Sequence, residues 1–205
     1  MNNIIYDQSL NYWNSIAGHY ESQIEPLHKP SFDYIVNKVH NIYGKGDKPI
    51  TILDLACGGG ELSYQLIKSY KNVNIVMVDF ADDYETIINK KMTGYTNYKF
   101  IKGSLDAIPF NDNQFDLVIC SNGLMYADLD DTLSEVRRVM KDSGRFIFSV
   151  WDKIDNCDFL KPVHHMINKM FASKFPFGFI DMTSLSNSDE MVEALEDNGL
   201  GNVCN

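Results

Sequence analysis

The segment Ile52-Leu53-Asp54-Leu55-Ala56-Cys57-Gly58-Gly59-Gly60-Glu61-Leu62 runs from an apolar stretch through three glycines into a stretch of helical character. Glycine has no Cβ and tolerates positive φ, so the chain can turn sharply here and present backbone N–H groups to a ligand. Many α/β proteins have such a loop, and a tight turn without a ligand would give the same pattern. The segment predicts a strand, a loop and a helix. Whether the loop binds a ligand has to be judged from the neighbouring motifs.

Further apolar runs resemble the one that precedes the glycines. They are continuous rather than alternating, which is typical of parallel strands covered on both faces. The predicted strands are residues 50–55, 75–78, 115–120 and 146–151, with a weaker one at 98–101. Because helical or turn segments separate them, the sequence predicts an α/β protein with a doubly wound, mostly parallel sheet and right-handed crossovers.

Helical periodicity marks the segments on either side of the glycine loop. Two amphipathic runs precede the loop, so two N-terminal helices are expected. The second run covers residues 32–39, and the first has its apolar positions at Tyr12, Trp13, Ile16 and Tyr20. Ahead of the final predicted strand, one stripe of apolar residues at helical spacing predicts a helix, which ends in a turn at Asp142-Ser143-Gly144. Its members are Leu129, Leu133, Val136 and Met140.

The C-terminal part is also predicted to be helical. A first stretch has Phe159, Val163, Ile167 and Met170 on one face, and an aromatic loop at 175–179 follows it. A last helix is predicted to start with Ser188 as its N-cap and to end at Gly199. The side chains that it turns inward are Met191, Val192 and Leu195.

The composition fits one domain and disfavours several kinds of partner. With 205 residues and 44% hydrophobic residues, the chain can bury one substantial core. The 18 basic and 28 acidic side chains give a net charge of -10, which repels nucleic-acid phosphates and anionic lipid surfaces. No stretch approaches the ~18 apolar residues of a membrane span, and no apolar signal-peptide core follows Met1. We expect a cytoplasmic protein with no nucleic-acid or membrane partner.

The four cysteines predict neither a metal centre nor a disulfide framework. Cys57, Cys120, Cys157 and Cys204 contain no C-x-x-C pair. The adjacent His164-His165 point in different directions on a helix and have no partner at ligand spacing. We expect reduced thiols, no bound metal, and Cys57 as a small buried spacer rather than a nucleophile.

The glycine loop does not complete the dinucleotide-binding fingerprint. G-x-G-x-x-G would need a glycine three residues after Gly60, where Ser63 stands. Asp79, 19 residues after Gly60, closes the second predicted strand, where a carboxylate can accept hydrogen bonds from both hydroxyls of an adenosine ribose. The pattern favours a nucleoside ligand other than NAD.

With these motifs, residues 10–200 resemble the class I S-adenosylmethionine-dependent methyltransferases, and within them the small-molecule enzymes similar to ubiquinone/menaquinone C-methylases (methyltransferase type 11 domain). In this resemblance Ala56 replaces the first glycine of the first motif. The resemblance implies S-adenosylmethionine as the cofactor, Asp79 as the ribose ligand and Phe80 as the side chain that packs on adenine.

The later motifs extend the resemblance. In 102–110, Ser104 takes the place of the family's aspartate that bonds the adenine amino group, and Asp106 stands close by. The segment 120–126 matches the part of the family that lies beneath the methionine moiety and faces the acceptor. The implied cofactor-binding residues are Asp54, Ala56, Cys57, Gly58, Gly60, Asp79, Phe80, Ser104, Leu105, Ser121 and Tyr20.

The resemblance implies one methyltransferase domain over 1–205. It would consist of an N-terminal helical cap at 1–48, a cofactor-binding core at 49–151 and C-terminal helices at 152–205, in which the loop 175–179 is either an acceptor lid or a packing segment. The family's sheet normally continues with another pair of strands, for which the six residues after Gly199 are too few. We therefore expect an incomplete C-terminal strand pair and an uncovered edge beside the fifth strand, with either reduced stability or a homodimer formed through that edge as the result.

The implied reaction is transfer of a methyl group to a small-molecule acceptor by in-line substitution. A general base is needed only if the acceptor must lose a proton. Tyr20, Tyr126 and His19 are the weak candidates, and His28, His164 and His165 qualify by residue type alone. Two alternatives remain open: a catalytically silent scaffold that binds S-adenosylmethionine or a partner, and a less favoured NAD-dependent oxidoreductase.

Overall fold

The computed structural model describes residues 3–44, 48–158, 161–162 and 183–203. Its five-stranded sheet has the order β3-β2-β1-β4-β5, and every pairing is parallel. The strands are β1 (Ile50–Leu55), β2 (Val73–Asp79), β3 (Tyr98–Lys102), β4 (Phe115–Ser121) and β5 (Met140–Ser149). The predicted doubly wound α/β fold is confirmed, together with its N-terminal helices.

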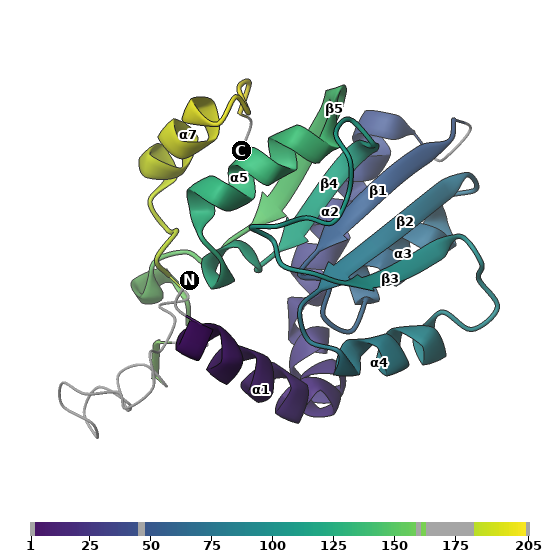
Figure 1. Cartoon of the computed structure of the whole chain (residues 1–205), viewed down its shortest axis with the longest axis horizontal. Coiled ribbons are helices and arrows are strands. Elements are labelled where there is room, and N and C mark those ends of the chain that lie inside the picture. Colours follow the sequence, from purple (N-terminus) through teal and green to yellow (C-terminus); the bar gives the residue numbers. More distant parts are fainter. Residues whose placement is uncertain (1–2, 45–47, 159–160, 163–182, 204–205) are drawn as a thin grey trace.

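Helices cover both faces of the sheet (Figure 1). The α-helices are α1 (Asn3–His19), α2 (Lys29–Tyr43), α3 (Glu61–Ser69), α4 (Asp83–Lys91), α5 (Leu129–Val139) and α7 (Ser188–Asp197). Shorter turns of helix are η1 (Tyr20–Ile24), η2 (Glu25–His28), η3 (Leu124–Tyr126) and η4 (Ile154–Asn156). In Figure 1, α5 and α7 cover one face, α2 and α3 lie behind the other, and α1 lies beyond the carboxyl ends of the strands.

The core has two parts, one on each face of the sheet. Ile52 in β1 belongs to the cluster formed with α2, α3 and α4, whereas its neighbour Leu53 belongs to the cluster formed with α5 and α7. Successive side chains of a strand point to opposite faces, so β1 must be apolar at consecutive positions. This requirement explains the continuous apolar runs in the sequence.

The register brings the chemically distinctive segments to one edge of the sheet. Leu55, at the end of β1, pairs with Val78 in β2 and with Cys120 in β4. The glycine loop, Asp79 and Ser121 therefore all lie at the carboxyl edge of the sheet. The strand order reverses between β1 and β4, which is where α/β proteins of this kind bind their ligands.

The structure corrects the prediction around β5. This strand begins at Met140 rather than at residue 146, so Met140 lies in the strand and not in the preceding helix. The predicted turn Asp142-Ser143-Gly144 is part of an irregularity inside β5, because Phe115 pairs with Met140 while Leu117 already pairs with Arg145. The extra residues of β5 bulge out of the ladder instead of separating two elements.

The C-terminal helix was predicted with a small error at its start. The N-cap of α7 is Asn187, whose Oδ1 accepts from the Asp189 N–H at 3.1 Å, and not Ser188. Met191 and Leu195 are buried as predicted, Val192 is half-buried, and Gly199 follows the helix with φ of 72°. The predicted helix face from Phe159 to Met170 and the loop 175–179 lie outside the described residues.

In the described part of the chain, β5 pairs with β4 alone, so β5 is the uncovered edge strand that the sequence predicted. Whether another chain covers this edge stays a prediction. Among the described helices, none is both long and apolar enough to cross a bilayer.

A buried ion pair fixes the N-terminal helices to the core. Lys91, at the end of α4, has its Nζ 2.7 Å from Glu25 Oε2 and 3.2 Å from Glu61 Oε2. Glu25 lies in η2 and is only 3% exposed. Burial raises the pKa of Glu25, and the Lys91 charge opposes that rise. One cation therefore joins η2, α3 and α4, which are distant in the sequence.

Replacing Lys91→Met leaves the buried Glu25 carboxyl without its cation and should lower the free energy of unfolding by about 3 kcal/mol. Urea denaturation measures the change. The matched control is Lys29→Met, because Lys29 and Asp33 form an ion pair whose side chains are 66% and 47% exposed. The control should cost about 0.5 kcal/mol or less. Equal, small effects of the two substitutions would contradict the structural role of the buried pair.

Thr132 in α5 offers a second test of the packing. Its hydroxyl is buried and has no hydrogen-bond partner among the described residues. Thr132→Val removes an unsatisfied polar atom at nearly constant shape, so it should raise the free energy of unfolding by about 1 kcal/mol. Thr93→Val is the control, since the Thr93 hydroxyl donates to the Lys90 carbonyl at 2.8 Å. A loss of stability in Thr132→Val would show that the hydroxyl is satisfied.

Candidate functional site

The glycine loop is a compact turn between β1 and α3. Ala56, Gly58 and Gly60 have φ angles of 52°, 52° and 76°, in the left-handed region that glycine adopts most easily. Ala56 holds this conformation at some cost in strain, and its methyl group lies where a Cβ on Gly123 would come within 2.5 Å. The loop and the segment after β4 therefore touch, and Gly123 leaves room for Ala56.

Asp79 fastens this loop to the end of β2. Its Oδ2 accepts from the Gly58 N–H, and its Oδ1 accepts from the Ala81 N–H, each at 3.0 Å. A carboxylate oxygen has two acceptor sites, so each oxygen can still accept a hydroxyl hydrogen. Burial raises the pKa of Asp79 to about 6. Asp79 is thus a fixed acceptor beside the loop, in the position that the sequence predicted for a ribose ligand.

Asp54 lies beneath the loop and binds the adjacent helix. The Ser63 hydroxyl donates to Asp54 Oδ2 at 2.6 Å, and burial raises the pKa of Asp54 to about 7. Ser63 is the residue that interrupts the dinucleotide fingerprint. In this structure it holds the start of α3 against β1, where the fingerprint would place a glycine for close helix–strand packing.

The N-terminal cap contacts the loop through aromatic rings. A Cβ on Gly58 would lie 3.2 Å from Tyr20 Cε1, so the Tyr20 ring rests on the loop. Trp13 packs edge-on against both Tyr20 and Tyr126, with ring centroids 5.6 Å and 5.3 Å apart. The cap therefore brings Tyr20 and Tyr126 together at the carboxyl edge. His19 is exposed at the end of α1, and no side-chain contact joins it to the loop among the described residues.

Burial also determines the protonation of these groups. It raises the pKa of Tyr20 far above the usual range, with a further rise from the Glu25 charge, and raises the pKa of Tyr126 to about 12. Burial likewise raises the pKa of the Cys57 thiol. At neutral pH both phenols are hydrogen-bond donors, and Cys57 is a neutral thiol.

The segment after β3 lies beside Asp79. The Gly103 N–H donates to the Asp79 carbonyl at 3.0 Å, Leu105 is buried, and the Ser104 hydroxyl donates to Asp106 Oδ1. The Asp106 carboxylate is thus held next to the serine that replaces the family's aspartate. Phe80, directly after Asp79, is half-buried.

Two features near the site had no local signal in the sequence. Glu25 lies so close to the loop that a Cβ on Gly59 would be 2.8 Å from both carboxylate oxygens. A chain of hydrogen bonds also links Ser121 to His28 through side chains at the ends of β4 and β5. Both connect segments far apart in the sequence, so only the folded chain reveals them.

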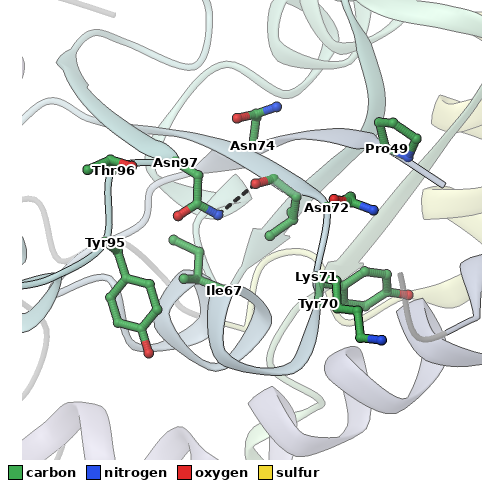
Figure 2. Close-up of a pocket in the computed structure, with 10 residues that line it drawn as sticks. Pro49, Ile67, Tyr70, Lys71, Asn72, Asn74, Tyr95, Thr96 and Asn97 are labelled. Carbon is green, nitrogen blue, oxygen red and sulfur yellow. Dashed lines mark hydrogen bonds between the residues drawn. The ribbon is translucent and has the colours of Figure 1, made fainter. Parts of the chain in front are cut away.

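One cavity lies away from this edge. About 590 Å³ in volume, it lies at the amino ends of β1, β2 and β3, and Figure 2 shows Tyr70, Asn72, Tyr95 and Asn97 around it. The Asn97 side chain donates to the Val73 carbonyl at 2.7 Å and so closes the start of β2. Ligands of doubly wound folds bind at the carboxyl ends of the strands, and we therefore place the candidate site at the glycine loop. Among the described residues, no three His, Cys, Asp or Glu side chains are grouped to hold a metal ion.

Known proteins resemble this chain in sequence. The family described as a methyltransferase domain matches residues 46–199. The ubiquinone/menaquinone biosynthesis C-methyltransferases of Rickettsia typhi and Francisella philomiragia are 32% identical over 111 residues and 31% identical over 136 residues. These alignments cover 50% and 62% of this chain, and 45% and 48% of the two relatives. The chain therefore spans about half the length of these curated relatives.

Solved structures resemble it in fold. An S-adenosylmethionine-dependent methyltransferase of Thermotoga maritima matches with a TM-score of 0.65 and 15% identity, over 93% of this chain and 80% of that one. A chain of Methanococcus maripaludis described in the same terms matches with a TM-score of 0.60 and 19% identity, over 93% and 81%. Identities this low establish the fold alone, whereas the family match covers the whole glycine-loop core. The chain belongs to the methyltransferase domain family, within the class I S-adenosylmethionine-dependent methyltransferases.

Proposed function

We propose that this chain transfers a methyl group from S-adenosylmethionine to a small-molecule acceptor. The observation that carries the proposal is the Asp79 carboxylate, which is buried at the end of β2, bonded to the Gly58 N–H and still able to accept from two hydroxyls. A ribose with adjacent hydroxyls matches this acceptor. The glycine loop lies beside it, and because the loop N–H groups of Cys57, Gly58 and Gly60 already donate within the protein, Asp79 is the polar group on which the proposal depends.

The residues around the loop fit the parts of the cofactor in turn. Phe80 and Leu105 would pack against the adenine, and Ser104, with Asp106 behind it, would supply the polar contact. Tyr20 and Ser121 would border the methionine part. Asp54, Ala56, Cys57, Gly58 and Gly60 would hold the loop in shape, and of these Asp54 acts through Ser63 from beneath it.

The chemistry requires little beyond alignment. When bound, the cofactor supplies a methyl carbon that is already electrophilic because it is attached to a sulfonium. The chain must orient the acceptor and keep water away, which is a task for the aromatic surface of Trp13, Tyr20 and Tyr126. Because burial keeps both phenols protonated, Tyr20 and Tyr126 fit the role of hydrogen-bond donors better than that of general bases.

A small-molecule acceptor is supported by the curated relatives, whose names assign them C-methylation in quinone biosynthesis. The net charge of -10 speaks against nucleic acid as the acceptor. We propose a single methyltransferase domain with the boundaries expected from the sequence, and a homodimer through the β5 edge remains part of the proposal. The Ser63–Asp54 bond disfavours NAD, and the Ser104–Asp106 bond weakens the argument for a silent scaffold.

Two measurements separate these functions. Calorimetry should detect binding of S-adenosylhomocysteine, the demethylated cofactor, and no binding of NADH. A metabolite screen with methyl-labelled cofactor should then yield a labelled product. Binding without any labelled product would favour the scaffold, and binding of NADH alone would overturn the proposal.

Asp79→Asn should weaken S-adenosylhomocysteine binding by about 1 to 3 kcal/mol, because the amide cannot accept both hydroxyls. The matched control is Asp82→Asn, a nearby carboxylate that is 55% exposed and pairs with Lys102. The control should bind with unchanged affinity, and thermal melting of both variants checks the fold. An unchanged affinity of Asp79→Asn would exclude Asp79 as the ribose ligand.

The pH dependence of the same affinity tests the charge of Asp79. Its pKa of about 6 means that the carboxyl binds a proton below that pH and then offers fewer acceptor sites. The dissociation constant should therefore rise as the pH falls through 6, by up to about tenfold per pH unit. Asp79→Asn should abolish this inflection. A separate inflection near pH 7 that persists in the variant would belong to Asp54.

A further inference from the structure

Polar side chains form a continuous chain from the sheet to the N-terminal cap. The Ser121 and Ser149 hydroxyls lie 3.0 Å apart, and Ser149 Oγ donates to Asn122 Oδ1 at 3.4 Å. The Asn122 amide nitrogen lies 3.2 Å from His28 Nδ1. This chain begins at Ser121, beside the proposed cofactor, and ends at a histidine for which the proposed function has no role so far.

The hydrogen bond to Asn122 determines which tautomer His28 adopts. With the Asn122 amide nitrogen facing Nδ1, His28 Nδ1 is the acceptor and the ring hydrogen is on Nε2, because an amide nitrogen donates and cannot accept. Among the described residues, no hydrogen-bond partner accepts from Nε2. Burial lowers the pKa of His28, which keeps the ring neutral. His28 is therefore a donor through Nε2, and its one lone pair is already used.

Three aromatic rings lie close to His28, and one of them belongs to Tyr20 at the glycine loop. The His28 ring centroid is 5.5 Å from that of Trp151, 6.2 Å from that of Tyr20 and 6.1 Å from that of Phe32. Tyr20 in turn rests on Gly58. His28 thus lies one ring contact away from the glycine loop and next to Trp151, two residues after the end of β5. An unused polar hydrogen among aromatic rings is typical of a group that orients a ligand.

We propose that His28 is a specificity-determining residue that binds the acceptor by donating its Nε2–H to an oxygen atom of it. This inference rests on the proposed methyltransferase function and defines the chemistry of the acceptor. The oxygen must have a free lone pair, as a carbonyl, ether or hydroxyl oxygen does. His28 does not remove a proton from the acceptor, because Asn122 occupies its basic nitrogen. An acceptor with only donor groups, such as an ammonium, would leave the Nε2–H unsatisfied.

The tautomer can be tested first, without any acceptor. Nitrogen-15 NMR of the imidazole rings should show the Nε2–H form of His28 both in the free protein and with S-adenosylhomocysteine bound. Asn122→Ala removes the donor to Nδ1 and should shift His28 towards a mixture of tautomers. A hydrogen on Nδ1 in the unaltered protein would overturn the proposal.

Binding can then be tested with two probes of similar shape. Acetophenone carries a carbonyl oxygen, and ethylbenzene lacks it. In the presence of S-adenosylhomocysteine, acetophenone should shift the His28 Nε2–H resonance and bind about fivefold more tightly than ethylbenzene, the factor expected for one neutral hydrogen bond. His28→Phe should abolish this preference, and His28→Gln, which keeps a donor, should retain part of it.

His19→Phe is the matched control, because His19 is an exposed histidine of the same cap. It should keep the preference for acetophenone. The proposal is wrong if His28→Phe keeps that preference, or if acetophenone leaves the Nε2–H resonance unshifted. Failure of the methyltransferase proposal would look different, since S-adenosylhomocysteine would then not bind, or would bind while methyl-labelled cofactor gave no labelled product. His28→Phe should bind S-adenosylhomocysteine within about twofold of the unaltered protein.

Discussion

The hydrogen bond from the Gly58 N–H to the Asp79 carboxylate is the constraint on which the candidate site depends. It joins the loop after β1 to the end of β2, two points that the parallel register already brings side by side. Without a residue that tolerates positive φ at 58, the N–H could not point to Asp79. Without the carboxylate, the loop would have a buried, unsatisfied donor. The same bond keeps Asp79 in place for a second set of donors, so the structural role and the proposed binding role share one side chain.

The N-terminal cap completes the site with residues from a short stretch of sequence. Tyr20 rests on the loop, Glu25 forms the buried ion pair with Lys91, and His28 bonds to Asn122 at the end of β4. Each contact reaches a different element of the core, so the cap is positioned at three separate points. Any change that loosens Glu25 should therefore also displace Tyr20 and His28, the two side chains that we propose for cofactor and acceptor binding.

The parts of this account that the sequence predicted are those with local signals. Continuous apolar runs and the glycines indicated the strands and the loop, and the interval from Gly60 to Asp79 indicated the ribose ligand that we propose. The predicted start of β5 was wrong because its bulge is defined only by the pairing of β5 with β4. The Glu25–Lys91 and His28–Asn122 contacts join residues 66 and 94 positions apart, for which a single sequence contains no signal. Ser63 was noticed only as a missing glycine, and its bond to Asp54 became apparent in the folded chain.

A crystal structure of the protein with S-adenosylhomocysteine tests the central claim most directly. We expect the adenosyl group between the glycine loop and the end of β2, with both ribose hydroxyls donating to Asp79 and the bond from Gly58 intact. A nucleoside found elsewhere, or an Asp79 carboxylate that makes only backbone hydrogen bonds while the cofactor is bound, would contradict the account.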